Sequence, residues 1–184
     1  MKLWLIRHAA VALPDGLCYG TSDVPAQADA TRVAAVAVAA VLPPAVPLWV
    51  SGLVRAQQMA AALQGLRPDL RAARVDRRLN EMDFGQWEMV AWSAVPRAAF
   101  DRWTADFAQH RFGGQESTQQ VIERVADALV DLHASGLSEA AWVTHAGVIR
   151  AARYLKAHGP RTIADAGEWP REAPAPGGFT LIEF

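Results

Sequence analysis

The sequence predicts an α/β protein, a three-layer α/β/α sandwich around a mostly parallel central sheet. Short strand-like apolar runs alternate with longer segments of helical periodicity along the chain, and this alternation is typical of parallel strands joined by crossover helices. The 184 residues are 52% hydrophobic and 20% charged, which suits one domain with a full core. We therefore expect a single domain over residues 1–184.

Five short segments predict the strands of the sheet, and the third of them is the weakest. They are residues 2–6, 47–51, 71–76, 140–144 and 179–183.

Four longer segments predict helices: residues 29–42, 54–66, 117–135 and 148–158. The first is rich in alanine and ends at two prolines, which cannot continue a helix. The third begins with a Ser-Thr-Gln-Gln capping box, and its apolar residues recur at spacings of four, four and three.

Two segments predict irregular structure. Residues 87–111 carry a helical but irregular signal that Pro96 interrupts, and we expect a helical lid or insert over about residues 87–116. Residues 159–178 contain four prolines and four glycines, which favour a loop.

The overall composition excludes several classes of protein. Eighteen basic and nineteen acidic residues leave a net charge of −1, which gives no basic footprint for nucleic acid or an anionic membrane. The longest apolar stretch, residues 33–42, is too short to span a bilayer. Cys18 is the only cysteine, which suits a reducing compartment. We expect a cytoplasmic protein with no nucleic-acid or membrane partner. The oligomeric state stays open, with a homodimer as one option.

Charged side chains and histidines follow the predicted strands where each strand ends. They are Arg7 and His8 after the first strand, Arg55 after the second, Glu81 after the third and His145 after the fourth. The carboxyl ends of parallel strands meet at one edge of a sheet, where α/β proteins bind their ligands. We therefore expect these five side chains to lie together.

Each residue alone has a structural alternative. Arg7 could bond the carbonyl groups at a strand end, and Glu81 could pair with a neighbouring arginine on a loop. His8 could be a hydrogen-bonded structural histidine, and His145 could be a neutral core histidine. Arg55 stands at a predicted helix start, where its charge opposes the helix dipole, and this favours a functional role. The joint placement of the five favours function over the separate alternatives.

This set of side chains suits phosphoryl transfer. Two guanidinium groups can each grip phosphate oxygens through two hydrogen bonds. One neutral imidazole can attack phosphorus while the other donates to an oxygen, and a carboxyl group can protonate the departing oxygen. No residues are spaced as metal ligands, so we expect no metal and no other cofactor, and a small phosphomonoester as the partner.

Four segments resemble the motifs of the histidine phosphatase superfamily, which has the phosphoglycerate-mutase-like fold. Residues 5–9 resemble its Arg-His-Gly signature, residues 51–58 its second arginine motif, residues 79–88 its acid motif and residues 143–150 its second histidine motif. The four follow the order of the family and cover most of the chain.

The resemblance implies a role for each residue of the site. His8 would be the phosphorylated nucleophile, Glu81 the proton donor and then the base that activates water, and the remaining three, Arg7, Arg55 and His145, would hold the phosphate. Tyr19, Gly20 and Ala146 would contact the substrate. The chain departs from the family in having Ala9 for glycine and in lacking the polar side chain expected near residues 13–14.

Within the superfamily the sequence most resembles bacterial α-ribazole-5′-phosphate phosphatases, on residues 17–25, 103–107 and 113–117, the last with an inserted Gln115. The aromatic residues Trp92, Trp103, Phe107 and Phe112 either contact a flat substrate or fill the core under the lid. The resemblance implies hydrolysis of α-ribazole 5′-phosphate. A broad-specificity phosphatase and a non-catalytic member that binds a phosphorylated ligand or a protein are the alternatives.

Overall fold

Five strands form one mixed sheet in the order β3-β2-β4-β1-β5. The structure is a computed structural model that describes residues 1–184. Four strands run parallel to one another, and β5 pairs antiparallel with β1 at the other edge. The strands are β1 (Lys2–Arg7), β2 (Leu48–Val50), β3 (Arg74–Val75), β4 (Glu139–Thr144) and β5 (Phe179–Glu183). The mostly parallel sheet is thus confirmed.

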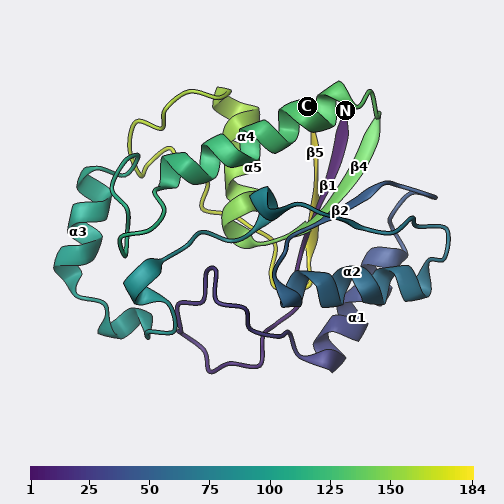
Figure 1. Cartoon of the computed structure of the whole chain (residues 1–184), viewed down its shortest axis with the longest axis horizontal. Helices are drawn as coiled ribbons and strands as arrows, with labels where there is room; N and C mark the ends of the chain where they lie inside the picture. The colour runs from purple at the N-terminus through teal and green to yellow at the C-terminus, as the bar shows by residue number, and fades with distance from the viewer.

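Helices cover both faces of the sheet. The helices α1 (Ala28–Ala39) and α2 (Val54–Leu66) lie on one side, and α4 (Thr118–Ala134) and α5 (Ala146–His158) lie on the other (Figure 1). A shorter helix, α3 (Arg97–Ala105), lies at one end of the molecule. The three-layer arrangement is the predicted one.

The two central strands bury side chains on both faces, as strands between two helical layers must. In β4, Trp142 belongs to the apolar core beneath α4 and α5, whereas Val143 belongs to the core beneath α1 and α2. In β1, Leu5 and Ile6 alternate between the same two cores. This packing fixes the position of the residues that follow each strand.

The segment between Gly85 and Ala105 is less regular than the other helical parts of the chain. It contains two 3-10 turns, η2 (Gly85–Trp87) and η3 (Trp92–Ala94), before α3 begins immediately after Pro96. Phe112 is fully buried, and its ring centroid lies 4.5 Å from that of Trp103. Phe112 and Phe107 therefore fill the core rather than face solvent.

Local sequence signals account for several boundaries. Ser117 and Gln120 form the predicted capping box at the start of α4. The loop 159–178 contains no helix or strand, as expected from its prolines and glycines. The predicted strand 71–76 is shorter than expected, since β3 contains only two exposed residues at the sheet edge. No helix combines the length and apolar character needed to cross a bilayer.

Candidate active site

The carboxyl edge of the parallel strands collects the five predicted residues. Arg7 ends β1 and pairs in register with Thr144, which ends β4, so His8 and His145 follow at the same level. Their ring centroids are 5.0 Å apart. Arg55 lies in the first turn of α2, after β2. Glu81 follows η1 (Arg77–Leu79), the turn that succeeds β3.

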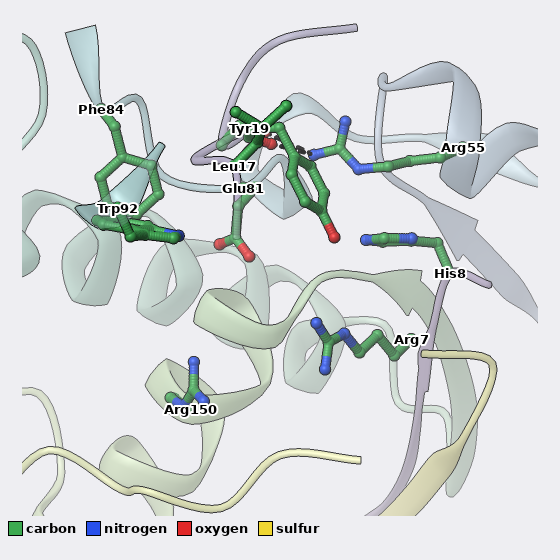
Figure 2. A pocket seen from close by; sticks show the side chains of 10 residues that line it. Arg7, His8, Leu17, Tyr19, Arg55, Glu81, Phe84, Trp92 and Arg150 are labelled. Carbon is green, nitrogen blue, oxygen red and sulfur yellow. Dashed lines mark hydrogen bonds between the residues drawn. The ribbon is translucent and has the colours of Figure 1, made fainter. Parts of the chain in front are cut away.

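A cavity of about 240 Å³ opens at this edge (Figure 2). Six of the eight predicted site residues line it: Arg7, His8, Tyr19, Gly20, Arg55 and Glu81. His145 is fully buried beside His8, and Ala146 is buried at the start of α5 and does not line the cavity. The structure thus brings the two arginines, the two histidines and the glutamate together.

The hydrogen bond of His8 fixes which nitrogen can react. Its Nδ1 lies 2.7 Å from the carbonyl oxygen of Ala9, and since a carbonyl only accepts, Nδ1 must carry the proton. In the neutral ring Nε2 then holds the free lone pair. Burial, followed by the positive charges of Arg55 and Arg7, lowers the pKa of His8 from 6.5 to about 3, against the opposing effect of the Ala9 bond. His8 is therefore neutral and nucleophilic at physiological pH.

His145 is oriented by a short chain of polar groups. The hydroxyl of Ser51 donates to Oδ1 of Asn80 over 2.9 Å, so its oxygen accepts from Nε2 of His145, which is 2.8 Å away. Burial, then the positive charge of Arg55, holds the pKa of His145 well below its usual range. The neutral ring has no proton on Nδ1, so His145 would donate a hydrogen bond from that atom only after it gained a proton.

Arg55 is held by backbone carbonyl groups rather than by a carboxylate. Its guanidinium donates to the carbonyl oxygens of Ser22, Gly20 and Tyr19 at 2.7, 2.5 and 3.3 Å. It is fully buried, and burial lowers its pKa. Its charge is thus available to an anion in the cavity.

The loop that supplies these carbonyl groups is itself held by Glu88. The carboxylate of Glu88 accepts the backbone N–H groups of Thr21, Ser22 and Phe84 at 2.9, 3.0 and 3.0 Å, and also the Ser22 hydroxyl. Glu88 therefore joins the loop that holds Arg55 to Phe84 at the aromatic end of the cavity.

Glu81 lies between the two ends of the cavity (Figure 2). Its Oε2 accepts the backbone N–H of Gly147 at 3.0 Å, and its Oε1 accepts the N–H of Met82 at 3.1 Å. Gly147 approaches so closely that a Cβ atom there would overlap Oε1. Two main-chain donors and a required glycine thus fix the position of the Glu81 carboxyl group in the cavity.

Several predicted site nitrogens have no partner within the protein. Five buried side-chain polar atoms in the chain are unpartnered, and three of them are Nε of Arg7, Nε of Arg55 and Nδ1 of His145. Each such atom costs about 1–3 kcal/mol when it stays unsatisfied. Arg7 makes one hydrogen bond, from Nη1 to the carbonyl oxygen of Pro174 at 2.9 Å.

Four cavity residues were not among the predicted site residues: Leu17, Phe84, Trp92 and Arg150. Trp92 was weighed as either a substrate contact or a core residue, and its ring faces the cavity (Figure 2). Arg150 lies three residues after Gly147 on α5, so helical periodicity could have placed it on the side of Glu81. No polar side chain of residues 9–18 lines the cavity, so none of them supplies the polar group that the sequence lacks near residues 13–14.

Cys18 is buried directly before Tyr19. Burial, then the charge of Glu88, raises its pKa to about 12. The group therefore stays a protonated thiol, as expected for a cysteine that is not a nucleophile. No group of three or more His, Cys, Asp or Glu side chains is placed to share a metal ion.

The sheet edge with paired histidines, paired arginines and a fixed carboxyl group defines a phosphoryl-transfer class of α/β protein. The chain belongs to the histidine phosphatase superfamily (branch 1), whose sequence profile matches residues 3–172. No curated protein sequence matches the chain.

Solved structures agree with this assignment. The protein TTHB049 from Thermus thermophilus is 27% identical with a TM-score of 0.74, over 100% of this chain and 94% of that one. A phosphoglycerate mutase from the same organism is also 27% identical, with a TM-score of 0.72 and the same coverage. The mycobacterial glucosyl-3-phosphoglycerate phosphatase Rv2419c, complexed with VO3, is 26% identical with a TM-score of 0.80, over 99% of this chain and 92% of that one.

Proposed function

We propose that the chain is a metal-independent phosphomonoesterase that works through a phosphohistidine on His8. The observation that carries this proposal is the set of unpartnered nitrogens on Arg7, Arg55 and His145 beside the reactive Nε2 of His8. A tetrahedral anion would supply those nitrogens with hydrogen-bond partners. Two guanidinium groups would also balance the charge that spreads over the phosphoryl oxygens during transfer.

The first half-reaction transfers the phosphoryl group to the enzyme. The Nε2 lone pair of His8 forms a bond to phosphorus while the phosphorus–oxygen ester bond breaks, and the protonated carboxyl of Glu81 gives its proton to the departing oxygen. The ring becomes positively charged, and the Ala9 carbonyl that accepts from Nδ1–H stabilises it.

The second half-reaction releases the phosphate. The Glu81 carboxylate takes a proton from water, the water oxygen bonds to phosphorus, and the phosphorus–nitrogen bond breaks. His8 returns to its neutral form with its proton still on Nδ1, and Glu81 is protonated for the next cycle.

We propose α-ribazole 5′-phosphate as the substrate, which would yield α-ribazole and phosphate. Two features support it: the sequence resemblance on residues 17–25, 103–107 and 113–117, and the apolar end of the cavity. There Leu17, Phe84 and Trp92 face the space beyond Glu81 (Figure 2), and Tyr19 lies between that end and His8. A flat, apolar benzimidazole suits such a wall. Within segment 87–116, Trp92 would act as part of a lid.

A panel of phosphomonoesters with EDTA present tests both levels of the proposal. We expect phosphate release from an aryl phosphate, loss of at least about 10³-fold in His8→Ala, and a kcat/KM for α-ribazole 5′-phosphate at least about tenfold above that for ribose 5-phosphate. Equal values would favour a broad-specificity phosphatase. Vanadate binding without product over hours would favour a non-catalytic ligand-binding member, and full activity of His8→Ala would reject the phosphohistidine.

A further inference from the structure

Arg150 occupies the end of the cavity away from His8. In Figure 2 its guanidinium lies below Glu81 and away from His8, Arg7 lies nearer to His8, and Phe84 and Trp92 lie above it on the same side of the view. Arg7 and Arg55 flank His8, so a phosphoryl group held between them at His8 would leave the rest of the substrate for the part of the cavity that Arg150 lines. It is the only charged side chain among the residues at that end.

The hydrogen-bonding groups of Arg150 are poorly used within the protein. Its contacts are two long ones, from Nε and Nη2 to the carbonyl oxygen of Arg171 at 3.4 and 3.3 Å, and it forms no ion pair, unlike Arg153 one turn later on α5. The side chain is half-buried, and burial lowers its pKa. A half-buried guanidinium with free donors gains most from an oxygen acceptor.

A second recess adjoins the cavity at Arg150. This smaller recess of about 100 Å³ shares Glu81, Phe84 and Arg150 with the main cavity, and its remaining wall is mainly apolar: Met82, Trp103, Thr118, Val121, Gly147 and Trp169. Arg150 thus stands at the boundary of the two spaces, and a leaving group longer than a few atoms would pass beside it.

We propose that Arg150 binds the leaving group of the substrate through an oxygen acceptor and so determines specificity rather than chemistry. The inference rests on the proposed phosphatase function, because it takes the phosphoryl group to lie at His8. Two kinds of leaving group carry such an oxygen, namely a sugar with free hydroxyls and an acid with a carboxylate. Both would face the same donors, and the carboxylate would gain more because it is charged.

The test compares substrates with and without the acceptor in Arg150→Gln. Ribose 5-phosphate offers hydroxyls, 3-phosphoglycerate offers a carboxylate, and phenyl phosphate offers neither beyond the ester oxygen. We expect KM to rise about tenfold or more for at least one of the two oxygen-bearing substrates, with kcat within about twofold and phenyl phosphate unchanged. Arg150→Lys should restore part of the loss, since it keeps the charge but not the fork.

Arg153→Gln is the matched control, because Arg153 lies one turn later on α5, is half-buried, and lines neither cavity. A rise confined to 3-phosphoglycerate identifies an acid as the leaving group, and a rise confined to ribose 5-phosphate identifies a sugar. An equal loss for phenyl phosphate, or no loss for either oxygen-bearing substrate, would overturn the role of Arg150.

The test distinguishes a failure of the Arg150 proposal from a failure of the phosphatase proposal. Wild-type protein that releases phosphate from none of the three compounds contradicts the phosphatase. In that case, calorimetry can still measure the binding of the same three compounds to wild type and to Arg150→Gln. Equal affinities of the two proteins would reject the proposed contact with Arg150.

Discussion

At the scale of single residues, burial and a neighbouring positive charge keep the two histidines of the site neutral. His8 and His145 are buried, with Arg55 also fully buried nearby, and both histidines are held neutral by that environment. The hydrogen bond to Ala9 then leaves the free lone pair of His8 on Nε2. The same burial has a consequence for stability, because a neutral buried histidine must become charged when the chain unfolds in acid.

The expected consequence is a loss of stability on the acid side. The pKa of His8 is about 3 in the folded chain against 6.5 ordinarily, so between these values the unfolded chain binds a proton that the folded chain does not. The stability is fully present above pH 6.5 and falls toward pH 3, by about 1.4 kcal/mol per pH unit for one such group. Urea unfolding of His8→Asn should therefore show a shallower decline below about pH 6.5 than wild type. Equal declines of stability in the two proteins would contradict the lowered pKa of His8. His145 contributes to the decline in both proteins.

Substitution by alanine should have opposite effects at two helical glycines, Gly147 and Gly65. A methyl group at Gly147 would overlap the Glu81 carboxyl, whereas one at Gly65, near the end of α2, meets no atom within 4 Å. Gly147→Ala should displace Glu81 and lower kcat for an alkyl phosphate by at least about tenfold. Gly65→Ala should keep kcat and raise the free energy of unfolding by roughly 0.5–1 kcal/mol. Steady-state kinetics measures kcat, and urea unfolding measures the free energy of unfolding. Equal kcat values for the two variants would contradict the role of Gly147 in positioning Glu81.

At the scale of elements, a short loop rather than a helix or strand holds the Arg55 guanidinium in the cavity. The carbonyl groups that hold Arg55 come from residues 19–22, a segment without helix or strand. Glu88 holds this segment from the end of a 3-10 turn, through main-chain N–H groups on both Ser22 and Phe84. A change at Glu88 should therefore act on Arg55 without touching it.

Glu88→Gln replaces one accepting oxygen by an amide NH₂ that faces N–H donors, so the 19–22 loop should loosen. We expect the inhibition constant of vanadate and KM to rise about tenfold while kcat falls less, because binding rather than the reacting atoms is disturbed. Glu168→Gln is a suitable comparison, since Glu168 also accepts a backbone N–H group, but its partners Ala164 and Arg161 line neither cavity. If both variants shift KM alike, Glu88 has no special positioning role.

At the scale of the whole molecule, the site joins segments that are far apart in the sequence. Arg7 and His8 follow β1, Arg55 belongs to α2, Glu81 follows η1, and His145 precedes α5. These segments meet only in the folded chain, so the unfolded chain cannot bind an anion in the same way. Ligand binding and global stability are therefore linked.

Inorganic phosphate should stabilise the whole protein by this linkage. At a phosphate concentration of 100 times Kd the free energy of unfolding should increase by about 2.7 kcal/mol. Urea unfolding with phosphate, compared with chloride at equal ionic strength, measures the gain. Arg55→Gln should lose most of it, and a gain that persists unchanged in this variant would show that the anion binds elsewhere.

Patterns in the amino-acid sequence were enough to predict the layers of the fold and five residues of the candidate site. The strand 179–183 and the capping box of α4 were predicted from local patterns, because apolar periodicity and capping depend on residues that are neighbours in sequence. Arg7, His8, Arg55, Glu81 and His145 were found because parallel strands bring their carboxyl ends to one edge.

How those residues are held, and what faces them, became visible only in the folded chain. The carbonyl groups around Arg55, the contacts of Glu88 and the half-buried guanidinium of Arg150 depend on the paths of the 19–22 and 159–178 loops. Such paths follow from long-range contacts and leave no periodic pattern in the sequence. The choice between core and cavity for the aromatic residues has the same origin, since Phe112 is buried while Trp92 faces the cavity.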